Sequence, residues 1–209
     1  MTQLTFVTGL PGSGKSHYTG ILAQQTGAEF IDDYKKHSLD GSLAFQRSRN
    51  YERLIALLSE GRDCIVNDID FYEPSSRQEA IDALVSQFRT ELDIKWVFFE
   101  KNIEACVQNV CHRALQTGRG LHSLGGLFAY AVIGNVPDNV EVLSVWSEQR
   151  SLIPRQAFPN EEILEVIHSL HWGLLHSKNR KDIHQLKWAE GADVLQKVLY
   201  SFLAQFESD

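Results

Sequence analysis

The sequence predicts an α/β fold with a largely parallel sheet. Short apolar, β-branched runs alternate along the chain with segments whose apolar residues recur at helical spacing. The strand-like runs cover residues 4–8, 28–31, 64–66 and 94–99, and a helical segment follows each of them. Repeats of this kind are typical of parallel sheets, in which a helix crosses back to the start of the next strand.

The elements of the first half follow in order from this pattern. After the first strand, apolar residues at helical spacing predict a helix that begins near Lys15 and stops at Gly27. A second helix is expected over about 45–59, before the strand at 64–66. A third helix opens at Pro74, and a clean amphipathic helix starts at Ile103, after the strand at 94–99.

The second half is less regular. Glycines interrupt any pattern over 116–139, so we expect a flexible segment or mobile lid there. Residues 140–146 fit a strand or a helix, and the prolines at 154 and 159 mark a loop. Asn160 then caps a helix or precedes a last strand, and the apolar stripe over 194–206 predicts a terminal helix that covers the core.

Size and composition indicate one globular domain. The chain has 209 residues, of which 43% are hydrophobic and 22% charged, values that are ordinary for globular proteins. We expect a single domain over 1–209, with a core at about 1–115, the lid-like segment at 116–139 and a C-terminal part at 140–209.

The turn after the first strand carries a phosphate-binding motif. Residues 9–16 read Gly-Leu-Pro-Gly-Ser-Gly-Lys-Ser, which fits the P-loop pattern of Gly, any four residues, Gly, Lys and Ser or Thr. Its glycines let backbone N–H groups approach phosphate oxygens, and the helix N-terminus adds a positive end. Lys15 is expected to meet the β- and γ-phosphates, and Ser16 to ligate Mg²⁺. The residues expected to bind ATP are Gly9, Pro11, Gly12, Ser13, Gly14, Lys15, Ser16 and His17. This motif predicts a P-loop NTPase fold, a three-layer α/β/α sandwich with a lid-like insertion and a helical C-terminus.

Acidic residues follow the predicted strands, at the sheet edge where ligands of α/β proteins collect. Asp68 and Asp70 follow the third strand, and Asp68 is placed as a Walker B acid that holds Mg²⁺ directly or through water. Asp32 and Asp33 follow the second strand, and either could accept the proton of a substrate hydroxyl. An acidic turn is the alternative in both places. Glu100 follows the fourth strand.

Residues 4–113 resemble the polynucleotide-kinase-like P-loop phosphotransferases, a group often labelled as ATPase domains that borders on the zeta-toxin and small-molecule kinases. The resemblance is carried by the loop, by Asp-Asp-Tyr-Lys at 32–35, by the strand that ends in Asp68, and by Pro74 and Arg77 at the start of a helix. It implies a kinase in which Asp32 is the catalytic base.

Other positions depart from the family or match it in part. Lys35 stands where the family has an arginine that contacts the acceptor phosphate, and Asp70 where it has an asparagine. Arg113 aligns with a lid arginine that stabilises charge on the transferred phosphoryl group, whereas Asn109 replaces a second one. For Arg113, a solvated arginine at a helix end is the alternative, and Arg119 is open to both readings.

Charge and cysteine content limit the partners and the compartment that we expect for the protein. The formal net charge of −7 argues against broad attraction to nucleic acid or to an anionic membrane. No apolar run approaches the roughly 20 residues that span a bilayer, and the N-terminus does not read as a signal peptide. Cys64, Cys106 and Cys111 have no paired spacing, which favours reduced core thiols in a cytoplasmic protein.

Two functions are compatible with these observations. The first is an ATP-dependent kinase that moves the γ-phosphoryl group to a hydroxyl of a small molecule, nucleotide or polynucleotide, with Lys15, Asp32 and Arg113 as catalytic residues. The acceptor and the oligomeric state are not indicated, and the charge does not favour nucleic acid. The second is a regulatory ATPase switch that hydrolyses ATP slowly and signals to a protein partner. The replacements at Lys35 and Asn109 favour it.

Overall fold

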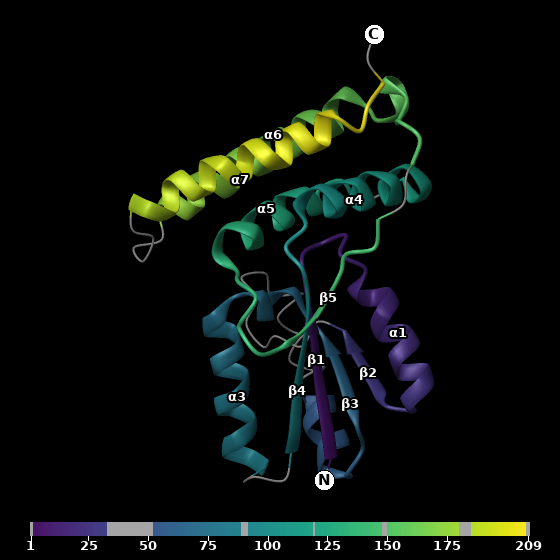
Figure 1. The fold of residues 1–209 in the computed structure, drawn as a ribbon, viewed down its shortest axis with the longest axis vertical. Coiled ribbons are helices and arrows are strands. Elements are labelled where there is room, and N and C mark those ends of the chain that lie inside the picture. The colour runs from purple at the N-terminus through teal and green to yellow at the C-terminus, as the bar shows by residue number, and fades with distance from the viewer. Residues whose placement is uncertain are drawn as a thin grey trace. The chain divides into compact units, whose positions relative to one another are not determined.

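The computed structural model describes residues 2–32, 52–88, 92–118, 120–147, 150–179 and 185–207. The strands are β1 (Thr2–Thr8), β2 (Glu29–Asp32), β3 (Cys64–Asn67), β4 (Leu92–Phe99) and β5 (Glu141–Leu143) (Figure 1). The helices are α1 (Lys15–Thr26), α3 (Pro74–Phe88), α4 (Ile103–Thr117), α5 (Ser123–Ile133), α6 (Asn160–Asn179) and α7 (Gln185–Leu203). Residues 52–59 are also helical, and η1 (Ile69–Tyr72) and η2 (Arg155–Ala157) are short 3-10 turns.

Contacts between Cα atoms divide the chain into two compact units. The strand unit comprises Met1–Gly9, Gly14–Glu100 and Asn135–Ser144, and so holds the five strands with α1 and α3. The helical unit comprises Leu10–Ser13, Lys101–Gly134 and Val145–Asp209, and holds α4 to α7. The single-domain organisation remains a prediction.

The strand unit is built on one parallel sheet. Its strand order is β2-β3-β1-β4-β5, and every neighbouring pair is parallel. The α/β fold predicted from the alternating pattern is therefore confirmed. The order also places β3, which precedes the acidic pair at 68 and 70, directly beside β1, which leads into the phosphate-binding motif.

Helices cover both faces of this sheet. On one face, Phe6 of β1 belongs to a buried cluster with Leu54 of the helix at 52–59 and Leu84 of α3. On the other face α1 packs against β1, β2 and β3, and the ring of Tyr18 meets that of Phe99 edge to face at 6.0 Å. Figure 1 shows α1 and α3 flanking the strands. Side chains alternate between the two faces along each strand, so apolar residues on both faces need a covering helix. The observed layers therefore agree with the predicted α/β/α arrangement.

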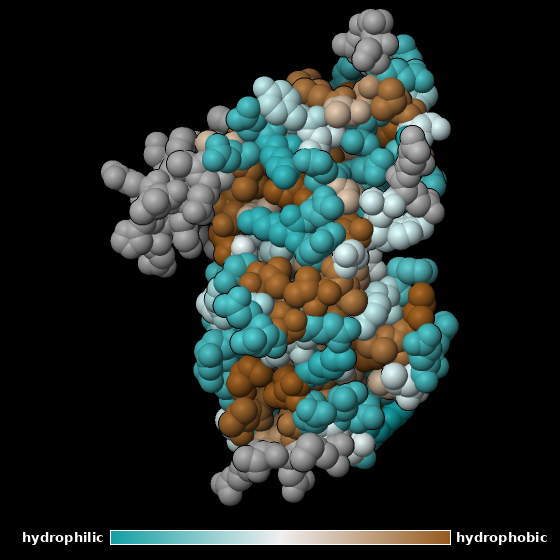
Figure 2. Space-filling model, viewed as in Figure 1, coloured by the Kyte–Doolittle hydropathy of each residue, from teal (hydrophilic) through white to brown (hydrophobic). Residues whose placement is uncertain are grey.

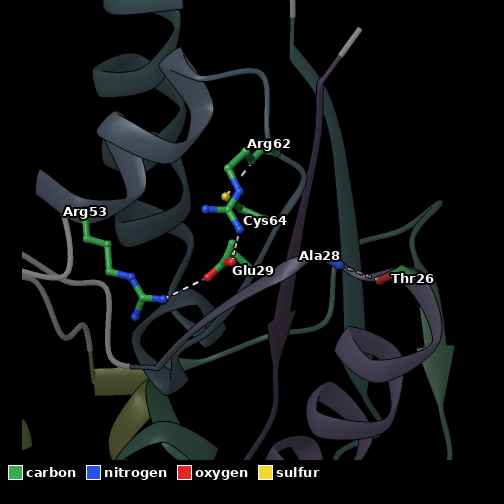
Figure 3. A network of polar contacts seen from close by, with 6 residues as sticks. All are labelled: Thr26, Ala28, Glu29, Arg53, Arg62 and Cys64. Atoms are coloured by element: carbon green, nitrogen blue, oxygen red, sulfur yellow. Dashed lines mark hydrogen bonds and ion pairs between the residues drawn. The ribbon is translucent and has the colours of Figure 1, made fainter.

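A charged cluster ties β2 to its neighbours at the end of the strand remote from Asp32. Glu29 accepts a hydrogen bond from Arg53 at 2.9 Å and another from Arg62, so its carboxylate lies between two guanidinium groups (Figure 3). The two arginine side chains are 54% and 49% exposed. Because such pairs are screened by solvent, each is worth about 0–1 kcal/mol.

The helical unit corrects one prediction. Residues 116–139 do not lack regular structure throughout, because Ser123–Ile133 forms α5. This helix is apolar on nearly every side and carries buried Leu127 and Phe128, so it has no amphipathic period to detect. Gly125 permits close packing, since a Cβ there would lie 2.2 Å from the Oγ of Ser169 on α6. The role of this segment as a lid remains a prediction.

Other elements of the second half settle alternatives left open by the sequence. Glu141–Leu143 is a strand, and Asn160 begins a helix. The terminal helix α7 packs on α4 and α5, with Val198 and Phe202 buried, as predicted. The hydropathy view in Figure 2 shows hydrophobic residues among hydrophilic ones on the face drawn. None of the described helices combines the length and the apolar character that a membrane crossing requires.

Candidate functional site

The loop between β1 and α1 has the backbone that the phosphate-binding motif requires. Gly12 and Gly14 have φ values of +84° and +98°, a region that glycine enters without strain. The Ser13 N–H donates to the Leu10 carbonyl at 3.0 Å, and the Ser13 hydroxyl is buried with no hydrogen bond inside the described ranges. Gly14 caps α1 without a side-chain hydrogen bond, so first-turn N–H groups can meet an anion.

Gly12 also has no room for a side chain. A Cβ at this position would lie 2.3 Å from the carbonyl oxygen of Cys106 on α4. The backbone of α4 therefore presses directly on the loop, and the close approach explains the glycine as well as its φ angle does.

The remaining loop positions differ in exposure. Gly9 is buried, Pro11 and Lys15 are partly buried, and Ser16 and His17 are exposed in the first turn of α1. Their contacts with ATP remain a prediction.

Asn67 holds the side chain of Ser16. Its Nδ2 donates to the Ser16 Oγ at 3.1 Å, and Asn67 is only 1% exposed at the end of β3. Its Oδ1 is buried too and makes no hydrogen bond within the part of the chain that the structure describes. A buried amide oxygen without a partner costs about 1–3 kcal/mol. Asn67 was not among the residues predicted from the sequence, although a polar residue that ends an apolar strand was the available signal.

Strand register brings Asp32 next to this residue. Asp32 and Asn67 are direct partners in the parallel pair β2–β3, so their backbones are about 4.8 Å apart. Ile31 and Val66 belong to the cluster on the opposite face. Because side chains alternate along a strand, Asp32 and Asn67 share the face that α1 covers. Asp32 thus lies one strand from the residue that contacts Ser16.

Asp68 occupies the next position and forms a turn. Its Oδ1 accepts the Asp70 N–H at 2.9 Å, which caps η1, and its own N–H donates to the Val7 carbonyl at 3.3 Å. Asp68 and Asp70 are 1% and 4% exposed. The acidic turn foreseen as an alternative is present, and a role of Asp68 toward Mg²⁺ remains a prediction.

In the helical unit, Arg113 and Asn109 have different environments. Arg113 is exposed, and its Nη2 donates to the Ser123 Oγ at 3.2 Å at the start of α5. Asn109 donates through Nδ2 to the carbonyls of Gly12 and Trp146, at 2.9 and 2.7 Å. A neutral amide therefore ties two backbone segments at the position where the resemblance predicted from the sequence would place an arginine.

Arg77 is built into the strand unit. Its guanidinium donates to the carbonyls of Phe71 and Tyr72 at 2.8 and 3.1 Å and to the Asn135 Oδ1 at 2.9 Å. It also lies 5.4 Å from the centre of the Phe98 ring. Burial lowers the pKa of Arg77. These contacts give the arginine a structural role, because they fasten η1 to the segment before β5.

The helical unit contains an open cavity of about 620 Å³. It is lined by His112, Leu115, Gln116, Trp146, Arg150, Ser151 and Leu152. Trp146 is 60% exposed, and the Arg150 guanidinium lies 5.8 Å from its ring centre. Burial, together with the charge of Arg150, lowers the pKa of His112. This pocket was not predicted from the sequence, because its walls come from α4, from Trp146 and from residues 150–152.

Other candidate residues stay untested. Asp33, Lys35 and Arg119 lie outside the described residues. The three cysteines are buried free thiols, and burial raises the pKa of Cys64 to about 11 and that of Cys111 to about 12.

The residues present fit Mg²⁺ and a nucleotide. Among the described residues, no three His, Cys, Asp or Glu side chains gather as a metal site of their own. Mg²⁺ at nucleotide sites is held mainly by phosphates and waters with few protein ligands, so none is required. The Ser16 hydroxyl, the buried oxygen of Asn67 and the glycine-formed loop match that demand.

Comparisons with known proteins add little to this geometry. No family model matches the chain, and no curated protein matches it. Similar solved structures include a gluconokinase from Sinorhizobium meliloti, with 18% identity over 85% of this chain and 98% of that one and a TM-score of 0.46. A fungal RNA kinase is 14% identical over 95% and 97%, with a TM-score of 0.43. A chain of the Pnkp1/Rnl/Hen1 RNA repair complex is 20% identical over 56% of this chain, with a TM-score of 0.43, and the match spans 39% of that chain. Likenesses this distant carry no argument about activity.

Proposed function

We propose that this protein is a P-loop phosphotransferase that binds ATP with Mg²⁺ and transfers the γ-phosphoryl group to a hydroxyl of its acceptor. The observation that carries the proposal is the loop: two left-handed glycines, a helix N-terminus without a side-chain cap, and Ser16 held from the adjacent strand by Asn67. This combination presents N–H donors and one hydroxyl to a polyphosphate and its cation.

Residues of the strand unit have separate roles in phosphoryl transfer. Lys15 offsets the charge of the β- and γ-phosphates, and Ser16 is the protein ligand of the cation. Bound Mg²⁺ supplies charge neutralisation and orients the phosphate oxygens. Asp32, next to Asn67 in the sheet, orients the acceptor hydroxyl and accepts its proton.

The cavity of the helical unit is our candidate for a small-molecule site. Its volume of about 620 Å³ is in the range of small-molecule sites. Trp146 offers an exposed aromatic face, with Gln116 and Ser151 as hydrogen-bonding neighbours. The Trp146 carbonyl shares its donor, Asn109, with the carbonyl of Gly12 in the loop.

A regulatory ATPase is the second candidate. Asn109 is neutral and already bonded to two carbonyls, so it supplies no charge to a phosphoryl group in transfer. Such a protein would bind and slowly hydrolyse ATP without passing phosphate to an acceptor.

Calorimetric titration with Mg²⁺–ATP tests the shared first step. The Lys15→Ala variant should lose at least about tenfold in affinity, which corresponds to about 1.4 kcal/mol. Lys197→Ala, on the exposed surface of α7, is the matched control and should bind as wild type does. Equal affinity in wild type and Lys15→Ala would overturn the proposal.

A further inference from the structure

We infer that Asn67 prepares Ser16 for the divalent cation, its amide oxygen accepting the Ser16 hydroxyl proton when the cation is bound. The inference rests on the proposed function and assigns to an asparagine a task expected of a strand-end carboxylate.

Two observations on Asn67 point to a second arrangement of its side-chain amide. Its Nδ2 contacts the Ser16 Oγ at 3.1 Å, and its Oδ1 is buried without a hydrogen bond from the described residues. Buried polar atoms are nearly always satisfied, so the open Oδ1 of Asn67 can take up a donor in another arrangement of the amide. Within the described residues only the Nδ2 of Asn67 is paired, and its partner is Ser16, the residue expected to ligate the cation.

The chemistry of the hydroxyl explains how the amide would act. A serine hydroxyl has one proton and two lone pairs. In the structure the Asn67 N–H occupies one lone pair of Ser16. A half-turn of the amide exchanges its nitrogen and oxygen in nearly the same space. The oxygen then accepts the Ser16 proton, and both lone pairs become available to a cation.

An amide differs from a carboxylate in charge. A carboxylate would accept the same proton and attract the cation through its negative charge as well. Asn67 provides the hydrogen-bond acceptor without the negative charge. Replacement by aspartate should therefore strengthen the effect of Mg²⁺ on nucleotide binding, and replacement by leucine should remove most of it.

The test compares ATP affinity by calorimetry in Mg²⁺ and in EDTA, with the ratio of the two dissociation constants as the readout. Wild type should bind at least about tenfold more tightly with Mg²⁺. Asn67→Leu should bring the ratio close to one. Ser16→Ala should lose the same advantage, and the double variant should lose no more than either single variant.

Controls separate this inference from a fault in folding. Ser201→Ala removes a buried hydroxyl on α7 and should leave the ratio unchanged. Asn67→Asp keeps the shape of the side chain and should equal or exceed the wild-type ratio. A fall in that variant, or a wild-type ratio in Asn67→Leu, would overturn the inference alone. Failure of wild type to bind ATP in both buffers would overturn the proposed function and the inference with it.

Discussion

The side-chain amide of Asn109 lies 2.9 Å from the carbonyl oxygen of Gly12 and links α4 to the phosphate-binding loop. The same nitrogen lies 2.7 Å from the carbonyl oxygen of Trp146, in the wall of the cavity. One neutral side chain thus fixes two backbone segments of the helical unit. This arrangement makes Asn109 a positioning residue.

Loss of this amide should weaken nucleotide binding. Asn109→Leu removes both hydrogen bonds and leaves two carbonyls to find other donors, at a cost of about 1–2 kcal/mol. We expect ATP affinity to fall by about tenfold, as measured by calorimetry. Gln108→Leu on the same helix is the control. A wild-type affinity in Asn109→Leu would show that the loop holds its form without this contact.

Addition of a methyl group at Gly12 should be far more damaging than at another glycine nearby. Gly12→Ala would place a Cβ 2.3 Å from the Cys106 carbonyl, at a φ of +84° that alone costs about 1–2 kcal/mol for an L-residue. We expect loss of ATP binding and a lower Tm by thermal unfolding.

Gly20 provides the matched control for that change. It lies within α1, and a Cβ there would meet nothing within 4 Å. Gly20→Ala should raise stability by about 0.5–1 kcal/mol, because alanine favours the helix. Equal effects of the two substitutions would contradict the close approach of α4 to the loop.

Acid should destabilise the fold through His112. Burial and the charge of Arg150 hold the pKa of this histidine below its ordinary value of 6.5. The unfolded chain therefore binds the proton more readily, so stability should fall as the pH drops below 6.5 and level off below the folded-state pKa. Chemical denaturation between pH 5 and pH 7.5 measures this.

Two variants check that assignment. His112→Gln should show a smaller loss of stability on acidification, and Arg150→Gln, which removes the neighbouring charge, should shift the fall to a narrower interval near pH 6.5. A loss as large in His112→Gln as in wild type would assign the acid response to other groups.

Local patterns predicted the strand unit well, for a physical reason. A buried parallel strand and an amphipathic helix each leave a period in the sequence, and the loop motif depends on consecutive residues. The segment at Ser123–Ile133 left no period because α5 is apolar on nearly every side. Its glycines suggested flexibility, whereas Gly125 serves close packing against Ser169.

The candidate site was harder to predict because sheet pairing creates it. Asn67 meets Ser16, 51 positions earlier, only because β3 lies beside β1 and α1 covers that face. Asp68, one residue further, was the carboxylate predicted to hold Mg²⁺, and its Oδ1 accepts the Asp70 N–H. The cavity likewise joins α4 to Trp146 and residues 150–152, which no periodicity in the sequence connects.

Transfer of labelled phosphate tests the central claim most directly. ATP labelled at its γ-phosphate would be incubated with the protein, Mg²⁺ and a panel of metabolites, nucleotides and oligonucleotide ends. Lys15→Ala serves as the binding-deficient control, Asp32→Asn as the variant expected to bind ATP but to transfer about 10²–10⁴-fold more slowly, and Asp193→Asn on α7 as its matched control. Label on one class of acceptor, absent with Lys15→Ala and Asp32→Asn, is the result that a phosphotransferase predicts. Label released only as inorganic phosphate, or left on ATP with every acceptor, would contradict it.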